Sequence, residues 1–156
     1  LAQRMAAKLG FAQADAASER LGAGLLGLLH KWRVDYSIFW RRLSHWAQDP
    51  EAAAHPLTDL FAEPEAVVLW LQHYRQQIAE APQRHSAALM LRSNPKYVLR
   101  NHLAESAIAA AQRKDYSVFE QLQQALADPF DEQPACDALA DFPPAWASQI
   151  AISCSS

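Results

Sequence analysis

The sequence predicts an all-α protein, an irregular multi-helix domain with a Pro-rich C-terminal tail. Glycine is scarce, with four residues in 156, whereas the helix-forming residues Ala, Leu, Gln, Glu and Arg are abundant. Apolar residues recur at helical spacing, as Ile38, Phe39, Leu43 and Trp46 do. No alternating β-branched segment typical of a strand stands out, since the nearest candidate, "AVV" at 66–68, lies inside a helical pattern.

Local start and stop signals divide the chain into expected helices. Pro64 and Pro82 suit the first turn of a helix. We expect helices near 1–9, 13–31 and 34–47, from Pro64 to Pro82, from Pro82 through Met90, from Pro95 to 113 and from Ser117 to Asp128, with a connection over 49–63 that holds one helical turn and a short turn near Trp146. Residues 1–128 are therefore expected to form the helical domain, and 129–156 its Pro-rich loop and tail.

Two start signals lie in the second half of the chain. In "SNPKY", Asn94 suits the N-cap and Pro95 the first helical position. The helix that follows is expected to face inward with Val98, Leu99, Leu103, Ala107 and Ala110. Further on, Ser117 and Glu120 have the spacing of a capping box.

Composition and charge exclude several function classes. The net charge of −3 gives no overall positive field for nucleic acid or an anionic membrane, and no apolar run approaches the roughly 18 residues of a membrane span. Two cysteines form no disulfide framework and indicate a reducing setting, so a cytoplasmic location is expected. The opening "LAQRMAAKLG" has no initiator Met and no signal-peptide pattern, and we expect the chain to be part of a longer protein.

Most motif-like features have a structural explanation. "GAGLLG" at 22–27 matches the dinucleotide fingerprint by letter, but that fingerprint needs a preceding strand. No two of the six histidines lie three or four residues apart and no CxxC occurs, so no zinc site is expected. His73 and His102 are interpreted as surface or packing residues rather than bases.

Three further groups have a functional and a structural interpretation, and the structural one is favoured for each. The aromatic stripe could be a ligand platform but has the spacing of a helix core; it comprises Trp32, Tyr36, Phe39, Trp40 and Trp46. Arg41 and Arg42 could hold a phosphate, but a solvated face or ion pairs with carboxylates is favoured. Asp131 and Glu132 could bind Mg²⁺, but acidic turn residues that accept backbone hydrogen bonds are favoured.

The two cysteines differ in their surroundings. Cys136 lies in a segment of mixed polarity, where a small packing residue is the default. Cys154 lies among Ser153, Ser155 and Ser156 near the end of the chain, so it is expected to be accessible. Access is one requirement for thiol–disulfide exchange, and a lowered pKa is the other.

Several ordered segments together resemble the C-terminal region of one family. They are "QRMAAKLG", "VDYSIFWRRLS", "NPKYVLRNHLAESAIAAAQRKDYSVFEQL", "PFDEQP", "FPPAWA" and the terminal "SCSS". They resemble the SelO/YdiU family of pseudokinase-fold protein adenylyltransferases, and the similarity is weakest over 48–85. The resemblance implies that the full-length protein transfers AMP from ATP, with Mg²⁺, to Ser, Thr or Tyr hydroxyls of proteins.

The resemblance places the catalytic, ATP and metal residues in a kinase-like domain before this region. It assigns no catalytic, cofactor-binding or metal residue to this chain, and it implies that 1–156 alone is inactive and binds neither ATP nor Mg²⁺. The expected partners are that kinase-like domain and the protein substrates. Cys154 alone matches a functional position of the family, a redox-regulatory residue thought to pair with a cysteine in the catalytic part; a Cys136–Cys154 bridge is the second choice.

Three questions stay open from the sequence. Lys96 and Arg100 are expected one turn apart on one helix face, which could point at the catalytic domain or be ordinary surface charge. A non-enzymatic helical interaction module that binds a protein through its aromatic face is the alternative function. A thiol protein that works alone is a third possibility and requires a Cys136–Cys154 disulfide.

Overall fold

The computed structural model describes residues 1–80 and 82–149, and these ranges confirm the predicted all-α fold. Extended pairing within them is an isolated bridge between Phe11 and His85. The α-helices are α1 (Ala2–Lys8), α2 (Ala16–Lys31), α3 (Tyr36–Trp46), α4 (His55–Thr58), α5 (Glu65–Glu80), α6 (Ala87–Ser93), α7 (Asn101–Gln112) and α8 (Ser117–Ala127). Short 3₁₀ helices follow at η1 (Pro82–Arg84), η2 (Pro134–Ala140) and η3 (Ala145–Gln149).

The chain divides into two compact units, Leu1–Pro95 and Lys96–Ser156. This division lies elsewhere than the predicted boundary at 128, because α8 packs against η2 and so joins residues on both sides of 128. The expected domain arrangement, 1–128 with its tail 129–156, stays a prediction.

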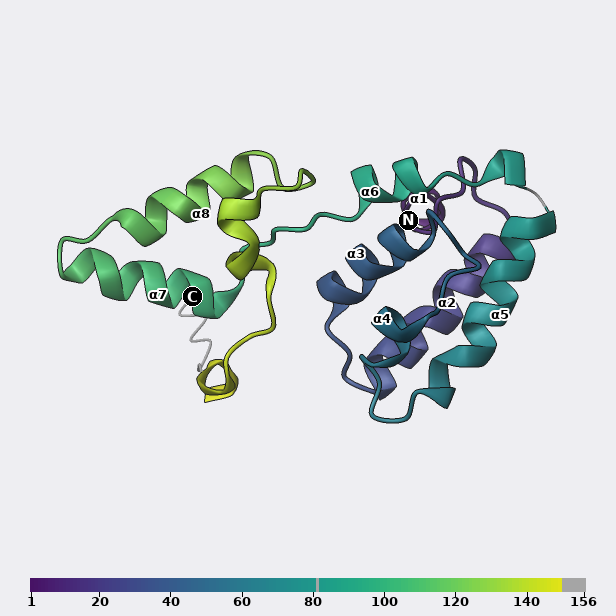
Figure 1. The fold of residues 1–156 in the computed structure, drawn as a ribbon, viewed down its shortest axis with the longest axis horizontal. Helices are drawn as coiled ribbons and strands as arrows, with labels where there is room; N and C mark the ends of the chain where they lie inside the picture. The colour runs from purple at the N-terminus through teal and green to yellow at the C-terminus, as the bar shows by residue number, and fades with distance from the viewer. Residues whose placement is uncertain (81, 150–156) are drawn as a thin grey trace. The chain divides into compact units, whose positions relative to one another are not determined.

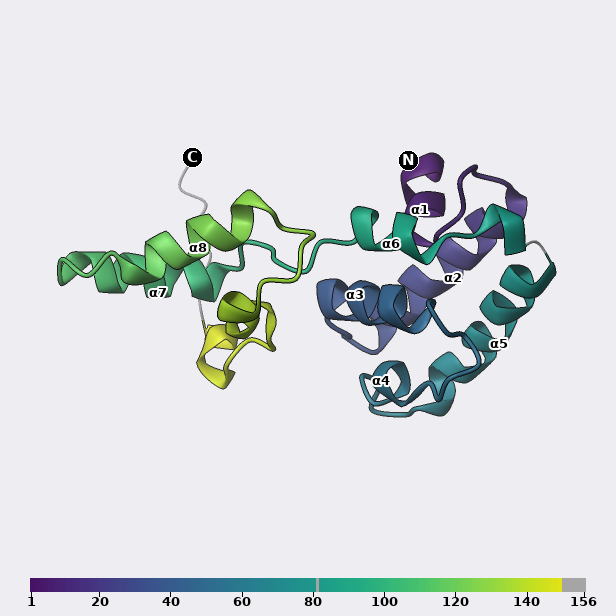
Figure 2. The same ribbon diagram turned by 45° about the horizontal axis from the view of Figure 1, so that its top comes forward.

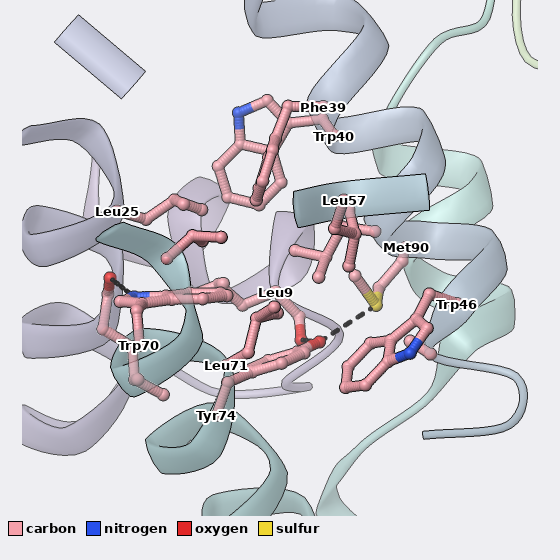
Figure 3. Packing of buried hydrophobic residues seen from close by; sticks show 14 of the residues in the cluster. Leu9, Leu25, Phe39, Trp40, Trp46, Leu57, Trp70, Leu71, Tyr74 and Met90 are labelled. Carbon is pink, nitrogen blue, oxygen red and sulfur yellow. Dashed lines mark hydrogen bonds between the residues drawn. The ribbon is translucent and has the colours of Figure 1, made fainter. Parts of the chain in front are cut away.

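Leu1–Pro95 is built around one hydrophobic core. Helix α2 packs against α1 and α5, and α3 packs against α4 and α6 (Figures 1 and 2). Figure 3 shows Trp70 stacked on Tyr74, with ring centroids 5.0 Å apart. The indole nitrogen of Trp70 donates a hydrogen bond to the carbonyl of Leu21 at 2.9 Å. Aromatic side chains thus fill the space between the helices, and Trp70 satisfies its polar atom within the core, whereas the buried indole nitrogen of Trp40 has no hydrogen-bond partner among the described residues.

The aromatic stripe belongs to this core, as the favoured interpretation predicts. Phe39, Trp40 and Trp46 are buried, and the Phe39 ring meets the Phe61 ring edge-on at 5.9 Å. Tyr36 at the start of α3 is the exception, with 43% of its surface exposed.

Polar side chains fix where the early helices begin. Asp15 caps α2 by accepting a hydrogen bond from the Ser18 amide at 2.8 Å, while the Ser18 hydroxyl accepts from the Asp15 amide at 2.9 Å. Asp35 caps α3 through the Ile38 amide at 3.0 Å. Both helices therefore begin slightly later than the apolar spacing predicts, since these caps satisfy amides that have no partner inside the helix.

The predicted helix start at Asn94 and Pro95 is wrong. Asn94 ends α6 as its C-cap, and α7 begins only at Asn101. The amides of Lys96 and Tyr97 donate instead to the carbonyl of Pro129, at 2.8 and 3.1 Å. Tertiary hydrogen bonds therefore hold this segment outside the helix.

Lys96–Ser156 contains a helical hairpin of α7 and α8. Leu103, Ala107 and Leu122 are buried where the two helices meet, which confirms the inward positions predicted for Leu103 and Ala107. Leu99, also predicted inward, is 62% exposed, because it precedes the helix rather than belonging to it.

The predicted capping box at Ser117 and Glu120 is also wrong. Ser117 is the first residue of α8, and the N-cap, Tyr116, makes no side-chain capping bond. Asp115 provides the side-chain hydrogen bonds at the start of α8 instead. Its carboxylate accepts from the Ser117 amide at 3.0 Å and from the Ser117 hydroxyl at 2.6 Å. The correct signal was an Asp two residues before the helix, which forms a local Asx-type turn.

Candidate functional site

Lys96 forms a charged cluster with two carboxylates of its own unit. Its Nζ donates to Glu132 Oε2 and to Asp137 Oδ1, each at 2.6 Å. Partial burial by itself would lower the pKa of Lys96, but the bonds to Asp137 and Glu132 outweigh it and raise that pKa above its ordinary value of 10.5. The positive charge of Lys96 is therefore already paired with carboxylates of its own chain.

This cluster corrects the expectation for Lys96 and Arg100. Lys96 and Arg100 do not lie one turn apart on a helix face, because both precede α7 in an extended segment. Asp131 and Glu132 are both exposed, and Glu132 accepts a hydrogen bond from Lys96 Nζ. The geometry favours a structural tie between residues 96 and 132–137.

Tyr97 strengthens the same tie. Its ring is buried, and its hydroxyl donates to the Gln133 carbonyl at 2.9 Å and accepts from the Gln133 amide at 3.2 Å. The side-chain amide of Gln133 in turn donates to the carbonyl of Ala125 at 3.1 Å. The segment before α7 is thus fastened to the segment after α8.

Cys136 lies next to Tyr97 and is fully buried, in a small cluster that also contains Ala125. This agrees with its interpretation as a small packing residue. The redox-regulatory candidate, Cys154, lies outside the described residues, so its role and its pairing stay predictions.

A buried polar cluster in Leu1–Pro95 was not predicted. The side-chain amide of Asn94 donates to the Lys8 carbonyl and to the Ser44 hydroxyl, both at 2.9 Å, and its oxygen accepts from Lys8 Nζ at 3.0 Å. Lys8 Nζ also lies 5.3 Å from the centre of the Trp40 ring, a cation–π distance. Burial lowers the pKa of Lys8. The cluster joins α1, α3 and the end of α6.

Arg41 belongs to this cluster, and its predicted solvated position is wrong. The guanidinium is buried and donates to the carbonyls of Leu91 and Asn94, each at 3.2 Å. These carbonyls lie at the end of α6, where a helix leaves acceptors without intrahelical partners. Arg42 instead donates to the carbonyl of Pro56 at 3.0 Å.

The histidines occupy packing and surface positions. His102 is buried and meets the Trp146 ring edge-on at 6.1 Å, whereas His73 is exposed, as predicted for both. His85, which the sequence did not single out, lies with Nε2 3.0 Å from the Tyr74 hydroxyl. Burial lowers the pKa of His85, although a hydrogen bond with Leu9 acts in the opposite direction.

The "GAGLLG" segment lies within the continuous helix α2, which confirms its helical interpretation. Gly22 is buried against Met5 of α1, and a Cβ at this position would collide with the Met5 side chain. Close packing between α1 and α2 therefore accounts for the first glycine of the segment.

An apolar groove runs along α7 and α8. It has a volume of about 580 Å³. Ile108 and Phe119, one from each helix, remain 53% and 54% exposed in it. Its lining comprises Leu99, Ala104, Ala107, Ile108, Phe119, Leu122, Gln123, Leu126 and Ala127. Sequence reasoning missed this groove because it assigned a single inward face to the helix expected from Pro95 to 113 and none to the helix expected from Ser117 to Asp128.

Residues 1–80 and 82–149 hold no group of three or more His, Cys, Asp or Glu side chains placed to bind a metal ion. Within 1–80 and 82–149, no helix combines the length and the apolar character needed to cross a bilayer.

The comparisons define the class of protein first. Proteins named "protein nucleotidyltransferase YdiU" match almost the whole chain: 49% identity over 98% of it in Variovorax paradoxus, 47% over 97% in Albidiferax ferrireducens, and 46% over 97% in Thioalkalivibrio sulfidiphilus. The chain spans 31% of the length of each of these relatives. A family model described as "Protein adenylyltransferase SelO" matches residues 1–127. The chain therefore belongs to the SelO family.

Proposed function

We propose that this chain is the helical region of a protein adenylyltransferase that transfers AMP from ATP to Ser, Thr or Tyr hydroxyls of other proteins. In that reaction the hydroxyl oxygen bonds to the α-phosphorus of ATP, and pyrophosphate leaves. One observation carries the proposal: relatives named protein nucleotidyltransferases match 96–100% of the chain at 42–49% identity. The name of the matching family, protein adenylyltransferase SelO, supports the choice of an adenylyl group.

The ATP and Mg²⁺ of this reaction are proposed to bind outside this chain. Mg²⁺ prefers carboxylate and phosphate oxygens in octahedral geometry. In the described part of the chain, Glu132 and Asp137 both bind Lys96 instead. These residues do not fit a metal site, so no catalytic step is assigned to them, and the isolated chain is expected to be inactive.

The chain itself is proposed to support the kinase-like domain of the full-length protein and to carry a regulatory thiol, Cys154. Oxidation would join the Cys154 sulfur to a second cysteine sulfur in the catalytic part, with a small disulfide as the oxidant, reduced to two thiols. Cys136 is the weaker partner, because its burial against Tyr97 and Ala125 shields its thiol from exchange.

The test is the intact mass of the full-length protein and of an added protein substrate after incubation with ATP and Mg²⁺, with and without reductant. We expect a gain of one AMP unit that increases with reductant, and we expect Cys154→Ser to remove the reductant dependence. Cys136→Ala is the matched control and should keep it. Absence of AMP transfer under both conditions would contradict the enzymatic proposal, whereas transfer indifferent to reductant would contradict only the role of Cys154.

The apolar groove favours one alternative, a helical interaction module without enzymatic activity. Its exposed Ile108 and Phe119 form a surface of the kind that binds another protein. The sequence before Leu1 separates the two proposals. A kinase-like segment there supports the enzyme, and an initiator Met directly before Leu1 supports the module.

A further inference from the structure

We propose that the groove between α7 and α8 is the docking site for an amphipathic helix from the part of the full-length SelO family protein that lies outside this chain. The inference rests on the supporting role proposed above and assigns it to a particular surface. Helix α7 would then be covered on two sides, by α8 and by the docked helix.

Each helix of the hairpin carries more apolar surface than the hairpin buries. On α7, Leu103 and Ala107 face α8, while Ile108 and its neighbour one turn earlier, Ala104, line the groove. On α8, Phe119 and Leu126 extend the apolar surface beyond the buried Leu122. A helix that is apolar over more than one stripe is typically buried on more than one side, so the hairpin has the character of an incomplete three-helix bundle.

The lining disfavours a small molecule. Ligand pockets place several polar groups around an apolar cavity to fix the orientation of the ligand. Gln123 is the one polar side chain among the nine residues that line this groove. A small ligand would therefore find apolar contact but little to orient it, whereas a helix needs only a row of apolar side chains.

The charges on the hairpin disfavour a membrane surface. Helices that lie on anionic membranes carry Lys and Arg beside their apolar face. Neither Asn101–Gln112 nor Ser117–Ala127 contains a Lys or Arg, and their charged residues are Glu105 and Glu120. Arg113 and Lys114 lie in the turn between the helices, so neither helix itself offers a cation to an anionic membrane.

The size of the relatives identifies the source of the helix. The chain covers 31% of their length, so the larger part of such a protein lies outside it. All nine groove residues fall within the 1–127 match, so the groove lies in the region that the family model describes. A segment tethered in the same polypeptide meets the groove at an effective concentration on the order of millimolar, which favours it over a separate partner.

The test places a photo-crosslinking amino acid at Phe119 in the full-length protein and maps the linked peptides by mass spectrometry. We expect a link from position 119 to a helical segment outside 1–156. Ile108→Asp should lower its yield about tenfold by placing a charge in the apolar contact, which corresponds to about 1.4 kcal/mol. The matched control Ala109→Asp, at an exposed position of α7 that does not line the groove, should leave the yield unchanged.

Other cross-linking patterns would overturn the proposal. These are links confined to 1–156, links between two copies of the protein, or no link at all. The photolysis does not depend on AMP transfer, so the two proposals can fail separately. A protein that cross-links as expected but transfers no AMP contradicts the enzymatic function alone, and an active protein without the link contradicts the docking site alone.

Discussion

Asn94 connects three parts of the chain through one buried amide. Its nitrogen donates to Lys8 and Ser44, its oxygen accepts from Lys8 Nζ, and its side chain is inaccessible to solvent. Removing such a group leaves buried polar partners without hydrogen bonds, which costs more than the bonds themselves contribute. Asn94 therefore contributes more to the stability of the fold than its position beside a proline suggests.

We expect Asn94→Ala to lower the free energy of unfolding by about 2–3 kcal/mol, the cost of leaving buried polar groups unpaired. Urea denaturation of chain 1–156 measures this change. Asn101→Ala is the control, because Asn101 is exposed at the start of α7. Equal effects of the two substitutions would contradict the role given to Asn94.

His85 makes the stability of Leu1–Pro95 depend on pH. Burial lowers its pKa in the folded protein below the ordinary value of 6.5. The unfolded chain therefore binds the proton first as the pH falls, and the free energy of unfolding decreases below about pH 6.5. Burial and the nearby charge of Arg100 also lower the pKa of His102, so the stability of the other unit, Lys96–Ser156, depends on pH with the same sign.

We expect His85→Gln to reduce the loss of stability between about pH 6.5 and pH 5, because the unfolded state then has one fewer group to protonate. Urea midpoints across this range provide the measurement. His73→Gln serves as the control, since His73 lies on the exposed surface of α5. A slope that His85→Gln leaves unchanged would contradict this assignment.

At the scale of elements, apolar spacing predicted which helices exist and which face each one buries better than it predicted where the helices begin and end. The stripe of Ile38, Phe39, Leu43 and Trp46 on α3 was correct, because a helix that buries one face must repeat its apolar residues. The start at Asn94 failed because its partners, Lys8 and Ser44, are 86 and 50 residues away. Local signals contain no information on such contacts.

Helix α2 offers a matched pair of glycines for testing how closely it packs. A Cβ on Gly22 would collide with Met5, whereas a Cβ on Gly27 would meet nothing within 4 Å. We expect Gly27→Ala to stabilise the chain by about 0.5–1 kcal/mol through helix propensity. Gly22→Ala should destabilise it by about 1–2 kcal/mol, because overpacking outweighs that gain.

Thermal or urea unfolding of the two glycine variants gives the comparison, with the wild-type chain as reference. If Gly22→Ala stabilised the chain as much as Gly27→Ala, Met5 would have moved aside without cost, and the close contact between α1 and α2 would carry no energy.

At the scale of the whole molecule, the two units have cores of different quality. Leu1–Pro95 buries Trp40, Phe39, Tyr74 and several leucines. Lys96–Ser156 buries fewer large side chains, Tyr97, Leu103 and Leu122, beside small ones such as Ala107 and Ala125. Apolar burial stabilises in proportion to area, so the second unit is the less stable one.

We therefore expect the amides of α7 and α8 to exchange with solvent deuterium faster than those of α2 and α5 in chain 1–156, since exchange reports local opening. Hydrogen-exchange mass spectrometry measures this directly. Equal protection in both units would show that they unfold as one cooperative body and would contradict the expectation.

The prediction of the family and the prediction of the fold used different information in the sequence. Ordered sequence segments predicted the family, which the comparisons confirm. The groove at Ile108 and Phe119 went unnoticed, because a single helical stripe cannot reveal that a second stripe is also apolar and exposed. The role of Cys154 stays a prediction.

The tie formed by Lys96 and Tyr97 with residues 132–137 also makes the hairpin tip available to protein engineering. The tie joins the two ends of the hairpin, and the tip around Lys114 is exposed, with φ of 63° at that residue. A peptide tag or fluorescent domain inserted after Lys114 would extend the chain at an exposed turn, at the cost of the hydrogen bond from the Asp115 amide to the Ala110 carbonyl. A protease cut there would leave both fragments held together, which makes the tip a natural place to split the protein into complementing halves.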